Sequence, residues 1–173
     1  DVRWFAVDPC FVFHVANAFD QADGSTVVDV VVHERMFDRS QQGPETGRAS
    51  GFERWTLTPG AECGERQVVS SEGQEFPRCD ERRTGKPYRL AYARTAILNE
   101  AMQPNALLRH DLEIGTTQRH EFGPDCLASE AVFVPRHEAA AEDDGWLLCF
   151  VHRLDGGSSH LAVIDAQQME AAP

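Results

Sequence analysis

Residues 12–30 of the chain read V-F-H-V-A-N-A-F-D-Q-A-D-G-S-T-V-V-D-V, and the same arrangement occurs twice more, at residues 74–93 and 129–151. Each copy contains an apolar strand interrupted by one polar residue, a charged turn that closes on glycine, and a longer apolar strand. The polar residues are His14, Glu75 and Glu130, and the turn glycines are Gly24, Gly85 and Gly145. This recurrence indicates a protein built from structural repeats.

Short runs rich in Val, Phe, Thr, Leu and Tyr, separated by Gly, Pro and acidic turns, predict an all-β fold. The expected strands cover residues 10–16, 26–33, 52–58, 66–71, 88–95, 107–113, 116–122, 131–135, 146–152 and 160–165. Residues 95–102 have a short helical pattern that Pro104 stops, and residues 38–50 are expected to form a polar loop.

The spacing of the repeats predicts β-propeller blades. The three polar residues lie 61 and 55 positions apart, an interval that holds four strands, and the signatures of WD40 blades are missing. About three blades cannot close a ring, and they leave edge strands uncovered. We therefore expect residues 1–173 to be a partial β-propeller, truncated at both ends. Because the innermost strand of each blade lines the channel, the three polar residues are expected to face one axis.

The composition narrows the class of protein. The chain has 28 acidic residues against 16 basic ones and a formal net charge of −12, so it lacks the clustered cations that nucleic acid requires. The five cysteines have no C-x-x-C spacing, which argues against a zinc ribbon and a disulfide scaffold. We expect a reducing cytoplasm, with Cys10 and Cys149 as buried small hydrophobic residues.

The three copies also carry motifs that resemble those of the carotenoid cleavage oxygenases, a family that includes stilbene-cleaving enzymes and the retinoid isomerase. The motifs are F-H-V-A-N-A-F-D (13–20), E-F-P-R (75–78), G-K-P-Y-R-L-A-Y (85–92), S-E-A-V-F-V-P-R (129–136) and E-D-D-G-W-L (142–147). Their order and spacing match the family over nearly the whole chain. The resemblance implies about three blades of a seven-bladed propeller that holds Fe(II) on its axis through four histidines.

The resemblance also implies roles for single residues. His14 is similar to the third iron ligand, Glu75 to the carboxylate that hydrogen-bonds it, and Glu130 to the carboxylate that supports the fourth ligand. A carboxylate on the second ring nitrogen orients an imidazole ligand and raises its basicity. The first two ligands are expected upstream of Asp1 and the fourth, in an F-H-G motif, after Pro173. By itself the fragment is therefore expected to be inactive.

The implied activity is Fe(II)-dependent oxidative cleavage of a conjugated C=C bond in a carotenoid, apocarotenoid or stilbene-type substrate, with O₂ as the second substrate. No side chain of this chain is expected to act as a nucleophile or a general base. The apolar substrate dissolves in membranes, so we expect a cytoplasmic protein whose complete form makes peripheral membrane contact. The alternative is a non-catalytic β-propeller that binds proteins and uses its axial residues only for structure.

Purely structural interpretations remain for the candidate residues. A histidine in a strand is usually a satisfied structural residue, and Glu75 and Glu130 have arginines nearby in Arg78 and Arg136. However, an unpaired carboxylate in an apolar strand is costly, which argues for dedicated partners.

Other polar residues carry weaker signals. His33, His110, His120, His137, His152 and His160 have no partner motif. His110 and His120 are possible cross-strand neighbours in a hairpin at 107–122, which leaves open an adventitious zinc site. Asn17 is expected to shape the strand end after His14. The E-D-D-G run at 142–145 lacks the spacing of a calcium loop and is interpreted as a tight acidic turn.

Overall fold

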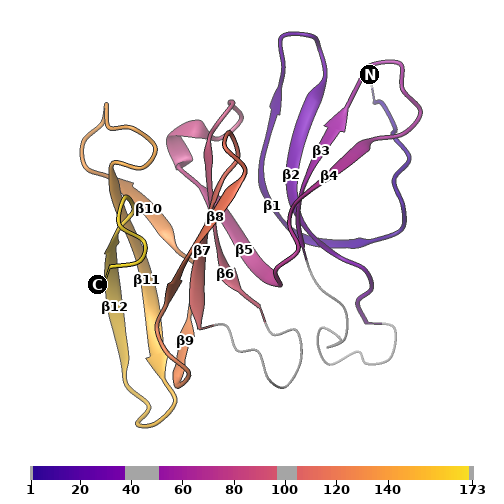
Figure 1. The fold of residues 1–173 in the computed structure, drawn as a ribbon. Helices are drawn as coiled ribbons and strands as arrows, with labels where there is room; N and C mark the ends of the chain where they lie inside the picture. The colour runs from indigo at the N-terminus through magenta and orange to yellow at the C-terminus, as the bar shows by residue number, and fades with distance from the viewer. Residues whose placement is uncertain (1, 38–50, 97–104, 172–173) are drawn as a thin grey trace.

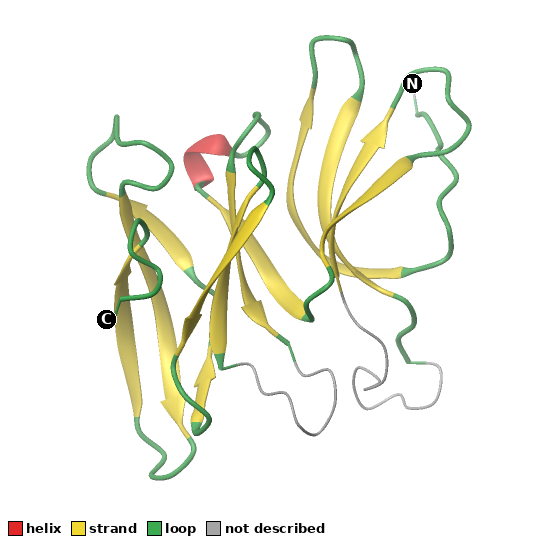
Figure 2. Ribbon diagram, viewed as in Figure 1, coloured by secondary structure: helices red, strands yellow, loops and turns green. Residues whose placement is uncertain are grey.

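The computed structural model describes residues 2–37, 51–96 and 105–171, which form three antiparallel sheets that lie side by side (Figures 1 and 2). The first sheet contains β1 (Phe11–Asp20), β2 (Thr26–His33), β3 (Gly51–Leu57) and β4 (Glu65–Ser70). The second contains β5 (Gln74–Cys79), β6 (Leu90–Thr95), β7 (Ala106–Asp111) and β8 (Thr116–Glu121), with the 3₁₀ turn η1 (Glu81–Arg83) between β5 and β6. The third contains β9 (Cys126–Ala128), β10 (Val132–Pro135), β11 (Gly145–Arg153) and β12 (Ser159–Asp165). The first two sheets have the four-strand order of a propeller blade.

In the third blade the innermost strand is divided. β9 pairs with one end of β11 and β10 with the other, so residues 126–135 follow a single edge with an interruption at residues 129–131. The first strand of each blade is thus innermost, as the repeat predicted.

Most expected strands appear within a few residues of their observed bounds, but three observed strands differ from the expectation. β5 and β9 were not among the expected strands, and β1 continues to Asp20 instead of ending at residue 16. β9 has only three residues, and Pro77 removes a backbone donor from β5. The expected loop at 38–50 lies outside the described residues, as do residues 97–102 of the expected helix. The two described residues of that stretch are not helical, since Thr95 ends β6.

The hydrophobic core lies between neighbouring blades. One cluster joins the first and second blades and contains Phe19, Val27, Val31, Phe52, Cys79, Tyr88 and Ala91. A larger one joins the second and third blades, where the rings of Tyr92 and Phe133 stack with centroids 5.8 Å apart. Burial of apolar surface between blades therefore holds them in fixed relative positions.

Buried polar side chains fix the same interfaces. Asn17 of the first blade donates to the carbonyl oxygens of Arg83 and Lys86 at 3.0 and 3.1 Å, and its Oδ1 accepts from the Gly85 amide at 2.9 Å. Glu142 of the third blade accepts from the backbone amides of Arg89 and Leu90. Asn17 thus does more than shape a strand end, because it also joins two blades next to His14.

Candidate functional site

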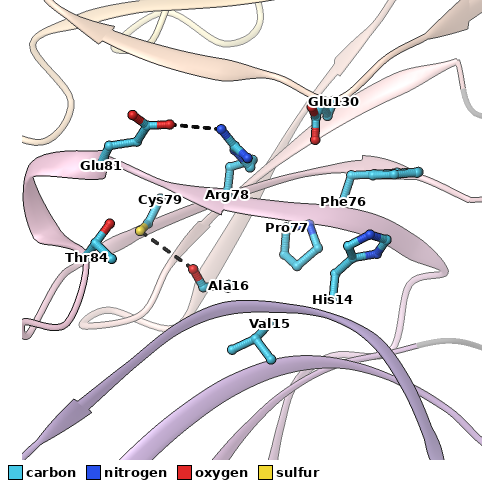
Figure 3. A pocket seen from close by; sticks show the side chains of 10 residues that line it. All are labelled: His14, Val15, Ala16, Phe76, Pro77, Arg78, Cys79, Glu81, Thr84 and Glu130. Atoms are coloured by element: carbon cyan, nitrogen blue, oxygen red, sulfur yellow. Dashed lines mark hydrogen bonds and ion pairs between the residues drawn. The ribbon is translucent and has the colours of Figure 1, made fainter.

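His14 lies where the pairing of β1 with β2 is irregular. The register shifts between Val12 and Val15 and again between Val15 and Asn17. Such a bulge leaves a residue out of the ladder and redirects its side chain. The imidazole of His14 is 44% exposed and lines a pocket of about 380 Å³ at the innermost strands (Figure 3).

Glu75 lies at a second irregularity, on β5. The register with β6 shifts between Glu75 and Arg78, and Phe76 adopts a positive φ of 55°. A positive φ is unusual for a residue with a Cβ. This backbone conformation turns the Phe76 amide onto the carboxylate of Glu75, with a nitrogen–oxygen distance of 2.9 Å. Strain of this kind is typical of functional sites.

Glu130 occupies the interruption between β9 and β10. It lines the same pocket as His14 and Phe76, and Figure 3 shows it on the far side of Phe76 from Val15. The three polar residues predicted from the repeat thus all lie at breaks in the ladder of an innermost strand. They come from three different blades: His14 and Glu130 line one pocket, and Glu75 is bonded to His14.

A hydrogen bond joins the first two of these residues across the blade boundary. The Nδ1 atom of His14 lies 2.7 Å from Oε2 of Glu75. Burial by itself raises the pKa of Glu75, but the hydrogen bonds from His33, the Phe76 amide and His14 outweigh it and hold the pKa below its usual range. An ionised carboxylate only accepts, so His14 carries its proton on Nδ1. Its Nε2 makes no hydrogen bond to any described residue.

His33 is the residue of this site that the sequence did not reveal. It ends β2, it is buried, and its Nε2 lies 2.5 Å from Oε1 of Glu75. No motif in the sequence indicates a partner for His33, but in the structure it has one. Its partner lies 42 positions away on another blade, where no local motif reports it. The sequence feature that could have indicated this residue is its place as a polar side chain at the end of the apolar run V-V-V-H.

Arg94 supplies positive charge behind the two glutamates. Burial lowers the pKa of Arg94, and the charges of Glu75 and Glu130 oppose this shift. Its guanidinium carbon lies 4.7 Å from the centroid of the Phe76 ring, a cation–π distance. The site therefore combines two carboxylates with one buried cation that partly offsets them.

Neither Glu75 nor Glu130 forms an ion pair with the arginine that lies near it in the sequence. Arg78 pairs with Glu81 and not with Glu75. Arg136 pairs with Asp144 and Asp165 and not with Glu130.

The hairpin histidines do not form the alternative zinc site. His110 lies opposite Thr117 and His120 opposite Leu107, so the two are not cross-strand neighbours. His110 binds Gln74 and Thr117, whereas Nδ1 of His120 donates to the carbonyl oxygen of Met169. Of the two cysteines expected to be buried, Cys149 is buried and Cys10 is only partly so.

The residues present fit one part of a metal centre. Within residues 2–37, 51–96 and 105–171, no group of three or more His, Cys, Asp and Glu side chains is placed to hold a metal ion. His14 nevertheless has the geometry of a histidine ligand: a carboxylate fixes a proton on its Nδ1, and the residue lines a pocket. Such a residue is one ligand of a site that needs further donors.

Comparison with known proteins assigns the family. The model of the retinal pigment epithelial membrane protein family (RPE65) matches residues 1–173, so the chain belongs to this family. The carotenoid cleavage oxygenase of Mycobacterium tuberculosis is 34% identical over 179 residues, which are 99% of this chain and 36% of that protein. The apocarotenoid-15,15'-oxygenase of Synechocystis is 34% identical over 180 residues, with the same two shares. The chain thus spans about a third of the length of these relatives.

Solved structures confirm the fold. Cobalt-substituted Synechocystis ACO matches with a TM-score of 0.88 and 33% identity, over 99% of this chain and 37% of that chain. An ACO/RPE65 chimera matches with a TM-score of 0.85 and 30% identity. The prediction of an all-β chain forming part of a β-propeller is therefore confirmed. Among the described residues, no helix has the length and apolar character needed to cross a bilayer.

Proposed function

We propose that the complete protein is an Fe(II)-dependent dioxygenase that cleaves a conjugated C=C bond of a carotenoid, apocarotenoid or stilbene-type substrate. Each carbon of the broken bond receives one oxygen atom of O₂, which gives two carbonyl products. The names of the relatives support this activity: two are a carotenoid cleavage oxygenase and an apocarotenoid-15,15'-oxygenase, and a 29% identical one from Aspergillus fumigatus is a resveratrol cleavage oxygenase.

The observation that carries the proposal is the state of His14. Its Nδ1–H donates to a buried carboxylate, and its Nε2 is open to a pocket at the innermost strands. We propose that this Nε2 holds iron together with histidines outside residues 1–173. The bound metal supplies O₂ activation, for which neutral imidazole ligands and open coordination positions are suited.

The other residues of this chain have supporting roles in the proposal. Glu75 orients His14 and fixes its tautomer. Glu130, which faces the same pocket from the third blade, would orient a histidine that lies outside this chain. We assign no nucleophile or general base to residues 1–173. The proposed setting is the cytoplasm with peripheral membrane contact, because an apolar polyene is drawn from membranes.

The test uses the complete protein and the variants His14→Ala and Glu75→Gln. Wild type should retain about one Fe(II) per chain and should consume O₂ while it cleaves an apocarotenal. H14A should lose both properties, and E75Q should bind Fe(II) about 10- to 100-fold more weakly, as is usual when the partner of a metal ligand is lost. His137→Ala is the matched control, since that exposed imidazole lies outside the site and pairs with Asp144, at 3.7 Å.

Several results would contradict the proposal. Wild-type protein without stoichiometric iron would favour a non-catalytic propeller. Full activity of H14A would show that His14 is not a metal ligand. Resveratrol, assayed in parallel with the apocarotenal, decides between the two substrate classes.

A further inference from the structure

The two oxygens of Glu75 are held by different elements of the fold. Oε2 accepts from Nδ1 of His14 on β1 at 2.7 Å and from the Phe76 amide at 2.9 Å. Oε1 accepts from Nε2 of His33 at the end of β2, at 2.5 Å. The carboxylate of Glu75, in the second blade, thus accepts hydrogen bonds from two imidazoles of the first blade.

The contact with His33 is the more buried of the two. The side chain of His33 is 10% exposed and that of His14 is 44% exposed. The ring of Phe13 packs edge-on against His33, with centroids 5.4 Å apart, and limits the access of water on that side. Without His33, Oε1 would be a buried acceptor without this hydrogen-bond donor, which is costly for an ionised carboxylate.

The geometry explains why one contact is not enough to orient Glu75. A carboxylate bonded through one oxygen rotates about its terminal bond with little resistance, whereas bonds to both oxygens fix its plane. The direction of Nε2 of His14 depends on that plane, because Nδ1 and Nε2 belong to the same rigid ring. Coordination demands orientation to within roughly 10–20°.

We propose that His33 is a positioning residue, which locks the carboxylate of Glu75 through Oε1 so that His14 presents Nε2 to the metal in a fixed direction. This inference rests on the proposed function and adds to it a residue from outside the motifs. His33 touches neither the metal nor the substrate, and it acts only through Glu75.

A matched pair of substitutions in the complete protein tests this role. Gln and Met have side chains of equal length, but only Gln supplies an N–H donor near the position of Nε2. Metal-free protein is loaded with Co(II), and two properties are measured: the visible absorption spectrum, which reports ligand geometry, and the rate of metal release to a chelator. Thermal unfolding of the metal-free protein is measured alongside.

H33Q should resemble wild type in spectrum and release rate. H33M should shift the Co(II) spectrum and release metal about 10-fold faster, at the low end of the range for outer partners of metal ligands. In a Glu75→Gln background, H33M should add no further acceleration, because its effect passes through the carboxylate. If H33M does not fold, His33→Asn takes its place, since that shorter amide does not reach Glu75.

Different failures have different meanings. If H33M keeps the wild-type spectrum and release rate while E75Q loses metal, the role of His33 is overturned and the proposed function stands. The same holds if H33M only lowers the unfolding temperature of the metal-free protein, because that marks a merely structural role. If wild-type protein does not bind Co(II) or Fe(II), the proposed function fails and the role of His33 fails with it.

Discussion

His110 shows what burial does to a histidine that has only neutral partners. It is 1% exposed, its Nε2 lies 2.7 Å from Oε1 of Gln74, and its Nδ1 lies 2.9 Å from the hydroxyl of Thr117. Its ring stacks on Phe52 with centroids 5.1 Å apart. Burial lowers the pKa of His110 from 6.5 to about 4, because no nearby carboxylate compensates the lost solvation of the cation.

A pH dependence of stability follows from this shift. The unfolded chain takes up a proton at His110 near pH 6.5, whereas the folded chain resists it down to about pH 4. The contribution to stability is therefore complete above pH 6.5 and is lost as the pH falls towards 4, by at most about 1.4 kcal/mol per pH unit. Unfolding temperatures of the complete protein at pH 7, 6 and 5 should fall less steeply in His110→Gln than in wild type. Equal slopes for both proteins would show that His110 does not titrate in this way.

The sequence identified some residues of the site and missed His33. The repeat predicted that His14 and Glu75 face one axis, whereas the hydrogen bond between them, which the structure contains, was implied by the family resemblance. His33 was missed because its role depends on a contact across a blade boundary with a residue far away in the chain. Residue types and local spacing carry no information about such a contact.

At the scale of the elements, the turn glycines of the repeat serve two different purposes. Gly24 and Gly85 have φ values of +84° and +74°, in the region that glycine adopts freely. Gly145 instead begins β11 against β10, where an added Cβ would lie 2.3 Å from the carbonyl oxygen of Val134 and 2.7 Å from the ring of Phe133. The sequence shows three equivalent glycines, and only the structure separates their causes.

Gly145→Ala should therefore destabilise the third blade. The methyl group overlaps with backbone that cannot move without breaking the β10–β11 ladder, so a loss of about 1–3 kcal/mol is expected, as for other overpacked sites. Gly156→Ala is the matched control, because nothing lies within 4 Å of a Cβ there. Thermal unfolding of both variants of the complete protein checks this, and equal unfolding temperatures would contradict the assigned clash.

Periodicity predicted the regular outer strands better than the irregular inner ones. β2 and β11 are largely apolar runs, and each was expected within one residue of its observed bounds. β5 and β9 were missed because the inner edge of the propeller is broken where it turns a polar side chain toward the axis. The irregular pairing that obscures the periodic pattern of these strands also places the polar residues of the site.

At the scale of the whole molecule, each blade contributes one polar residue to the site: His14 from the first blade and Glu130 from the third line one pocket, and Glu75 from the second is bonded to His14. The blades are held in place by the two apolar clusters between them and by the inter-blade bonds of Asn17 and Glu142. The direction in which each polar group points is therefore a property of blade packing rather than of any single strand.

Metal affinity should accordingly belong to the complete protein and not to residues 1–173. These residues offer one imidazole nitrogen to the pocket, and the described part of the chain contains no group of three or more possible ligands. In a Co(II) titration followed by visible absorption, the complete protein should saturate at about one equivalent. The chain of residues 1–173, checked for folding by circular dichroism, should give no saturable signal over the same range, and its H14A variant should behave identically. Binding of one equivalent of Co(II) by residues 1–173 with the affinity of the complete protein would contradict this, because the ligands would then have to lie within this chain.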